Sequence, residues 1–345
     1  MAKTKFSNLL SKKQFIFVVT FFFIVLYILH NTFFTANYYK GNSPQIFEIQ
    51  QGETLNSIAD SLFQKGIIPN KRNFKIAAFI YGAEKRIRAA RYEIPNGLNY
   101  LKLVELFLYG KADYLRNIKI YPGSTIESVA ASLKLDALID SSSFVETARS
   151  KSFLDSLGIN AQSVEGYLLP SEYLVYERSS PGELIKKFYR QFKNFMTDSL
   201  FNSRSAKNFS LHEIVTMASI VEGETKLISE MPTIAGVYYN RLKLGMKLQA
   251  DPTIQYVLPG EWRRLKFSDL KIDSPFNTYK YYGLPPAPIN NPSRDALYAA
   301  LFPENHNYLF FVADGTGGHK FSKNYSQHLT FVKEYRKWLE SQKQN

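Results

Sequence analysis

The chain has 345 residues, of which 45% are hydrophobic and 15% aromatic, so it is long enough for about two domains and too apolar to be disordered. Its formal net charge of +13 indicates an acidic partner, such as nucleic acid, a membrane surface or a carboxylate-bearing polymer. The absence of cysteine excludes disulfides, thiolate metal sites and cysteine nucleophiles.

A long apolar run stands near the N-terminus. The stretch FIFVVTFFFIVLYIL at 15–29 is followed by no charged residue before Lys40. With its flank it has about 20 residues, enough at about 1.5 Å per residue to cross a bilayer as a helix. Lysines precede the run, which predicts a cytoplasmic segment 1–14, a transmembrane helix 15–35 and an extracytoplasmic remainder. A cleaved signal peptide is the alternative, but its apolar region would be shorter and followed by small residues.

After a polar linker at 36–45, one pattern occurs three times within residues 46–135. The segments FEIQQGETLNSIADSL, YEIPNGLNYLKLVELF and IKIYPGSTIESVAASL align without gaps. Each has a short alternating strand, a glycine, an N-cap residue two positions later, and apolar residues at offsets of three, six, seven and ten, which form one helix face. The expected units are strand, glycine turn and capped helix. The first, with GETLNSIA, resembles a LysM module, a fold that binds N-acetylglucosamine polymers.

The remaining chain predicts a second, larger mixed domain. A serine-rich connection at 136–163 contains one expected helix, and a domain at 164–345 follows. Within this domain a glycine turn separates two apolar stretches and predicts a hairpin with His319 just past the turn. Caps, apolar stripes and stop signals predict helices at 143–157, 211–225, 229–243, 294–301 and 327–340, and a further one within SSPGELIKKFYRQFKNFM at 179–196. The expected fold class is therefore α+β.

The helix expected at 211–225, LHEIVTMASIVEGET, is apolar along most of its length and ends in two acids, Glu222 and Glu224. Burial raises the pKa of a carboxyl group, so an acid at the end of an apolar run is a candidate general acid. Residues two apart point about 200° away from each other on a helix, so both cannot face one cleft. Both acids continue apolar stripes, and Gly223 between them is expected to loosen the helix, so periodicity does not choose between them.

Other kinds of site find little support in the sequence. It contains no Walker loop, no GxGxxG after a strand, no HExxH and no GxSxG elbow. The histidines have no metal-ligand spacing, so no metal site and no cofactor are expected. Basic charge with many aromatic residues is compatible with single-stranded nucleic acid, but the extracytoplasmic location argues against it. Glycan chemistry by carboxylates, aided by aromatic platforms for sugar rings, remains.

Four blocks in the second domain, together with EGYLLPSEY, closely resemble the YceG-like (MltG) family of endolytic murein transglycosylases. The blocks are MASIVEGET, AGVYYNRLKLGMKLQADPTIQY, FNTYKYYGLPPAPINNPS and YLFFVADGTGGHKFS. The resemblance implies a single-pass inner-membrane protein, anchored before a LysM-like part, with a periplasmic catalytic domain. It further implies cleavage of the β-1,4 bond between N-acetylmuramic acid and N-acetylglucosamine within a strand, leaving a 1,6-anhydro end.

The same resemblance implies roles for individual residues. Position in the family's E-x-E-T block makes Glu224 the general acid and base and Glu222 its support, with Gly223 as a departure from the usual residue between them. The resemblance also implies that seven residues of this chain line or close the substrate groove: Glu165, Tyr167, Gln249, Asp251, Asn277, Tyr279 and His319. Implied partners are glycan strands, the inner membrane and cell-wall synthases. A non-catalytic murein-binding scaffold and a lysozyme-like hydrolase are the alternatives.

Overall fold

A computed structural model describes residues 11–260 and 262–342 of the chain. The chain divides into two compact units, residues 1–115 and residues 116–345, each with its own hydrophobic core. We call them the N-terminal unit and the C-terminal unit and describe each by itself. Helices and short two-stranded sheets occur in both, so the predicted α+β class is confirmed.

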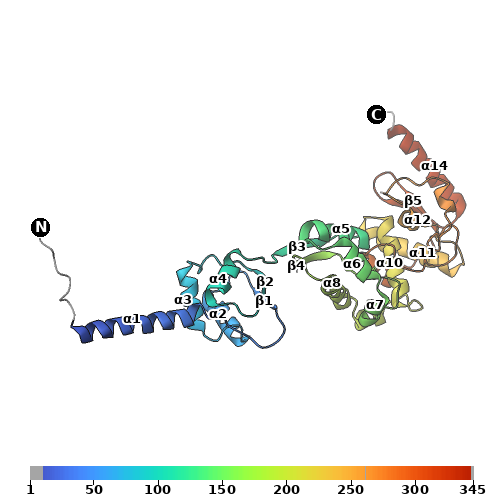
Figure 1. Ribbon diagram of the computed structural model, residues 1–345. Helices are drawn as coiled ribbons and strands as arrows, with labels where there is room; N and C mark the ends of the chain where they lie inside the picture. Colours follow the sequence, from blue (N-terminus) through green and yellow to red (C-terminus); the bar gives the residue numbers. More distant parts are fainter. Residues whose placement is uncertain (1–10, 261, 343–345) are drawn as a thin grey trace. The chain divides into compact units, whose positions relative to one another are not determined.

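The apolar run near the N-terminus forms one helix, α1 (Lys12–Phe33), the dark-blue helix in Figure 1. Ser11 and Gln14 make a capping box at its start, so the first turn has partners for its free amide groups. The part from Lys12 to His30 is long and apolar enough to cross a membrane, and none of its most apolar window is buried against the protein. Of the predicted cytoplasmic segment 1–14, residues 1–10 lie outside the described part of the chain.

Two of the three predicted repeats build the N-terminal unit. They are β1 (Gln45–Ile49) with α2 (Leu55–Gln64) and β2 (Ala90–Ile94) with α4 (Tyr100–Tyr109). The two strands pair antiparallel, and the predicted cap residues accept hydrogen bonds from the third helical amide as expected. A further helix between the repeats, α3 (Lys71–Ile80), packs against α2 and α4 and was not predicted.

The third repeat, β3 (Leu115–Ile120) with α5 (Ile126–Ala137), folds as predicted but belongs to the C-terminal unit. Its strand pairs with β4 (Ser171–Tyr176) and its helix packs against α6 (Ser141–Arg149). The structural break therefore falls at residue 115, whereas the sequence placed the end of the repeats at 135. Internal similarity identified the unit of structure but not its packing partner.

The connection predicted at 136–163 is part of the C-terminal core. It holds α6 and α7 (Lys151–Leu157) where one helix was predicted, and both bury apolar residues. Helix α8 (Pro181–Phe195) follows with the predicted Ser180 cap and its proline in the first turn, and a short α9 (Asp198–Ser203) comes next.

Helix α10 (Leu211–Glu224) is the centre of the C-terminal unit. A capping box of Ser210 and Glu213 fixes its start, and every residue from Ile214 to Glu222 is buried. It packs against α11 (Met231–Lys243), α12 (Asp251–Val257) and α13 (Arg294–Leu301). A helix enclosed on all sides is apolar all round, which explains why its stripes did not reveal a single inward face.

The predicted hairpin and closing helix are both present. Strands β5 (Phe310–Ala313) and β6 (His319–Ser322) pair antiparallel, and α14 (Tyr325–Gln342) packs against them. In Figure 1, α14 is the red helix that leads to the C-terminus. Helix α12 lies in a stretch from which only loops were predicted. Its Asp-Pro start is a usual helix opening, but the helix is short.

Candidate active site

Glu224 ends α10, and its side chain lies between exposed and fully buried. The hydroxyl of Tyr238 on α11 donates a hydrogen bond of 2.5 Å to its Oε1. Tyr238 is itself almost fully buried, so its ring cannot swing away from the acid. One carboxyl oxygen is thus held in place, while the side chain keeps access to solvent.

The surroundings of Glu224 adjust its ionisation. The pKa of Glu224 is raised to about 7, chiefly by desolvation in the enclosing protein. The hydrogen bond from Tyr238 and the charge of Arg241 lower this pKa, and the charge of Asp251 raises it. A carboxyl group with a pKa near 7 exchanges a proton readily at neutral pH. This is what a residue must do to act first as an acid and then as a base.

Arg241 supplies a fixed positive charge in this region. It lies on α11 one turn after Tyr238, with only 7% of its surface exposed. Its Nε donates to the carbonyl of Leu309 and its Nη1 to that of Leu248, each at 2.6 Å. Main-chain carbonyls hold the guanidinium group without neutralising it, so its charge acts on Glu224.

Two of the predicted groove residues, Asp251 and Tyr279, lie close enough to Glu224 to interact with it electrostatically, and Gln249 adjoins them. Tyr279 donates a hydrogen bond to Asp251, and the charge of Glu224 contributes to raising the pKa of Tyr279. Gln249 precedes them with an exposed side chain and a φ of +49°, and its amide donates to the carbonyl of Thr278 at 3.1 Å. A non-glycine residue in the left-handed region is often found at functional sites. Gln249, Asp251 and Tyr279 therefore form one polar surface next to the acid.

Glu222 has a different environment from Glu224. Its side chain is 2% exposed, and its Oε2 accepts a hydrogen bond of 3.0 Å from the amide of Ser293, the N-cap residue of α13. Its other oxygen lies 3.7 Å from the ammonium group of Lys226. The Oε2 contact thus joins α10 to the start of α13, and the other oxygen faces Lys226, so Glu222 has a structural role.

Gly223 does not loosen α10, contrary to the expectation from sequence. The helix continues through it to Glu224, and a Cβ atom at this position would lie 2.6 Å from Cβ and 2.8 Å from Cγ of Pro252. The absent side chain allows α12 to pack directly on α10. This contact places Asp251, the residue before Pro252, near the acid.

Gly223→Ala should therefore destabilise the protein and displace Glu224. Overpacking of this kind costs about 1–3 kcal/mol, since neither helix backbone can move freely. Thermal unfolding of the full chain in detergent measures the loss. The control is Ser132→Ala, which changes a partly exposed helix position and should leave the melting temperature within about 1 °C of the parent. Gly245→Ala is unsuitable as a control, because Gly245 has a positive φ that alanine would strain. An unchanged melting temperature for Gly223→Ala would contradict the packing argument.

Glu165 and Tyr167 bond to residues outside this polar surface. Glu165 is 2% exposed, and its oxygens accept from the amide of Ile126 at 3.1 Å and from Asn291 at 3.0 Å. Burial raises the pKa of Glu165 to about 8. The hydroxyl of Tyr167 lies 2.9 Å from Nδ1 of His212. Glu165 thus ties α5 to the loop before α13, a placement that differs from the groove lining predicted for it.

Asn277 and His319 also have defined partners. Asn277 is fully buried; its amide donates to the carbonyls of Leu270 and Ile272, and its oxygen accepts from two following amides, so it organises the loop that carries Tyr279. Nδ1 of His319 lies 2.7 Å from Glu230, whose other oxygen accepts from the His319 amide. This pair fastens the hairpin to the segment that follows α10.

Tyr238 and Arg241 were not identified from the sequence as site residues. They stand three apart in VYYNRL, so they share one face of α11. The sequence did contain a signal for Arg241: it lies on the same helix face as apolar residues expected to be buried. A buried charge requires specific partners, so such an arginine is a candidate site residue. Within the described residues, no group of His, Cys, Asp and Glu has an arrangement that could hold a metal ion.

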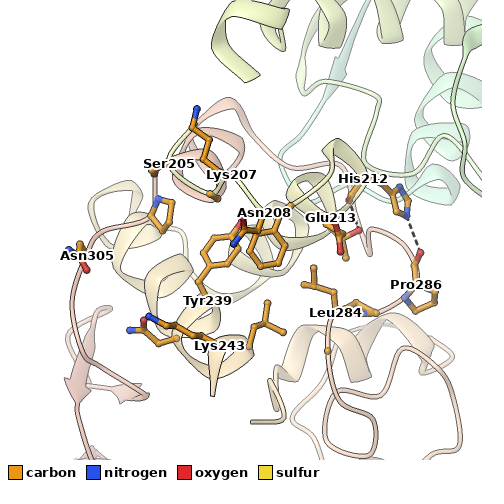
Figure 2. A pocket seen from close by; sticks show the side chains of 18 residues that line it. Ser205, Lys207, Asn208, His212, Glu213, Tyr239, Lys243, Leu284, Pro286 and Asn305 are labelled. Carbon is orange, nitrogen blue, oxygen red and sulfur yellow. Dashed lines mark hydrogen bonds between the residues drawn. The ribbon is translucent and has the colours of Figure 1, made fainter. Parts of the chain in front are cut away.

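Two of the cavities in the C-terminal unit bear on the site. One of about 920 Å³, shown in Figure 2, is lined by His212, Glu213, Tyr239, Lys243 and Leu284 among others and contains none of the predicted site residues. Tyr239 points into it from α11, while its neighbour Tyr238 contacts Glu224. A second cavity of about 690 Å³ includes Pro252, the residue packed on Gly223.

Fold and site together define an α+β protein whose candidate centre is one carboxylic acid of raised pKa, held by a tyrosine at the end of a buried helix. A profile of the YceG-like family matches residues 47–334. The chain belongs to the YceG-like family.

Individual relatives agree with this assignment. An endolytic murein transglycosylase of Bacillus subtilis (strain 168) is 30% identical over 304 residues, covering 83% of each chain. One from Streptococcus pneumoniae serotype 2 is 27% identical over 80% of this chain, which spans 55% of that longer protein. A crystal structure of a YceG-like protein from Listeria monocytogenes superposes with a TM-score of 0.57 at 27% identity, covering 84% of this chain and 99% of that one.

Proposed function

We propose that the protein is an endolytic murein transglycosylase that cleaves the bond between N-acetylmuramic acid and N-acetylglucosamine within glycan strands. Its named relatives support the activity. The observation that carries the assignment of the centre is the hydrogen bond from Tyr238 to Glu224, in surroundings that bring the pKa of Glu224 to about 7.

In the proposed reaction Glu224 acts twice. Its protonated carboxyl group donates a proton to the glycosidic oxygen, and the bond between that oxygen and the anomeric carbon breaks. The resulting carboxylate takes the proton of the C6 hydroxyl, whose oxygen bonds to the same anomeric carbon. The products are a free 4-hydroxyl and a 1,6-anhydro end, the acid is restored, and no water is consumed.

Neighbouring residues have supporting roles in this proposal. Tyr238 and Arg241 favour the carboxylate that the second proton transfer requires, and Asp251 favours the protonated form that starts the reaction. Gln249, Asp251 and Tyr279 are the groups best placed to contact sugar hydroxyls. Asn277 and His319 act through the loop and hairpin that they fix, and Glu165 and Tyr167 through the packing beneath them.

We also place the protein at the inner membrane. Helix α1 would be its single-pass anchor, with the N-terminus in the cytoplasm and both units outside, where the substrate lies. The strand–turn–helix repeats of the N-terminal unit resemble LysM modules and are proposed to contact glycan. Cell-wall synthases are the proposed protein partners, because cleavage has to be coordinated with strand synthesis.

The test is digestion of purified glycan strands by the full chain in detergent, with the products identified by mass spectrometry. Internal fragments ending in 1,6-anhydro-N-acetylmuramic acid are expected. Ends that carry an added water molecule would identify a lysozyme-like hydrolase instead. Binding of strands without any cleavage would identify a murein-binding scaffold.

A further inference from the structure

The cavity of about 690 Å³ lies directly beside the candidate active site. Pro252 lines it and packs on Gly223, and the residues on either side of this contact, Asp251 and Glu224, belong to the site. The start of α12 therefore separates the cavity from the acid by one layer of residues. A polymer bound at Glu224 could continue into this space.

The wall of the cavity comes from separate parts of the C-terminal unit. Gly123, Thr125 and Ser128 are contributed by the start of α5, Gln255 and Tyr256 by α12. Other lining residues are Glu127, Arg149, Leu258, Gly260, Trp262, Ile289 and Asn290. The volume falls in the range of pockets that bind small organic ligands, about 300–1,000 Å³.

Trp262 gives the cavity an aromatic platform. It is 66% exposed although it is large and apolar, so it is available to a ligand. The next residue is held in place: Gln255 of α12 bonds to both main-chain groups of Arg263, and the Arg263 guanidinium forms two hydrogen bonds, of 2.8 and 3.0 Å, with Asp269. Because the adjoining main chain is already held, less entropy is lost when a ligand packs on the ring.

The polar groups of the cavity suit a neutral ligand. Its charged residues, Glu127 and Arg149, are paired with each other, so they add no net charge. Asn290 donates to the carbonyl of Ser219 at 2.8 Å, while its buried Oδ1 has no partner among the described residues. Buried acceptors are nearly always paired in proteins, so this oxygen lacks a donor that a water molecule or a ligand hydroxyl in the cavity can supply. An aromatic face with amide and hydroxyl groups is the chemistry that recognises a sugar ring.

We propose that this cavity is a second saccharide subsite, which holds a sugar unit of the glycan strand away from the bond that Glu224 cleaves, with the ring against Trp262. The inference rests on the proposed function for the identity of the polymer. It adds a binding site that favours internal cleavage, because a strand has to extend beyond the scissile bond to fill it.

The test measures binding separately from cleavage. In the full chain carrying Glu224→Gln, the affinity for peptide-free glycan strands is compared with and without Trp262→Ala. The expected loss is about tenfold in Kd. Ser128→Trp, which fills the cavity from an exposed position of α5, should give a similar loss.

Matched controls lie close to both changes. Phe267→Ala removes an aromatic side chain that is 89% exposed in the same loop but does not line the cavity. Leu135→Trp places the same tryptophan side chain at an exposed position of α5 outside the cavity. Both should stay within about twofold of the parent Kd.

The outcomes separate the subsite from the reaction. Unchanged affinity in both Trp262→Ala and Ser128→Trp overturns the subsite, and so does a loss that appears only with strands that retain their peptides. If the unsubstituted protein does not cleave strands but binding still depends on Trp262, the proposed reaction fails and the subsite stands. If cleavage occurs and affinity is unchanged, only the subsite fails.

Discussion

Glu224→Gln is expected to lower the rate of strand cleavage by about 10²–10⁴-fold, the usual contribution of a positioned acid and base. Glutamine keeps the shape of the side chain and can still accept the hydrogen bond from Tyr238, but it cannot transfer a proton. Folding should therefore be retained. The rate of formation of anhydro ends from purified strands measures the effect, with circular dichroism as the check on folding.

Glu222→Gln is the matched control for this prediction. Glutamine can still accept the hydrogen bond from the Ser293 amide, so cleavage should remain within about tenfold of the parent. The expected cost is in stability, about 1 kcal/mol, since the capping interaction at α13 is weakened. Equal loss of activity in the two variants would contradict the separation of roles within this pair.

The sequence could not distinguish the two acids, and α10 explains why. Periodicity identifies a functional face only when the other face is exposed, and α10 is enclosed from Ile214 to Glu222. The distinction arises from partners far along the chain. Ser293 engages Glu222, whereas Tyr238 engages Glu224. Family position favoured Glu224, and the different partners are consistent with it.

The sequence predicted correctly those helices and turns that depend only on residues close to them in the chain. The N-caps Thr54, Asn99 and Thr125 each accept the expected hydrogen bond, and the apolar positions after each repeat glycine are buried, except that Leu55 is half-buried. The hairpin and the helices α8, α10 and α13 follow from caps, prolines and glycines that act within a few residues. Such features need no knowledge of the remaining fold.

Long-range packing accounts for what was missed. Whether the third repeat joins the first two depends on its partner β4, some fifty residues later, which local patterns do not encode. Glu165 was placed in a groove, but Ile126 and Asn291 enclose it. Gly223 was interpreted through backbone flexibility, but Pro252 determines its role. Each case required knowledge of which segments meet.

The pH dependence of cleavage provides a second strong prediction. The reaction starts from the protonated acid, so kcat/KM should fall as the pH rises through about 7, the pKa of Glu224. The groups that shift this pKa are Tyr238 and Arg241 from α11 and Asp251 from α12. Removing one of them should shift the falling limb of the pH profile, which is the pH range over which kcat/KM declines. The shift is to higher pH if the group favours the carboxylate and to lower pH if it favours the protonated acid.

Two substitutions should move the limb in opposite directions. Tyr238→Phe removes a hydrogen bond that stabilises the carboxylate, so the pKa of Glu224 rises and the falling limb moves to higher pH. Because the lost hydrogen bond is to a charged group, the expected shift is about one pH unit or more. Asp251→Asn removes a negative charge that favours the protonated form, so the limb moves to lower pH. Asparagine can still accept from Tyr279, which keeps the local structure. Profiles of kcat/KM from pH 5 to 9 measure both. Shifts in the same direction, or none, would mean that Glu224 is not the group whose ionisation controls cleavage.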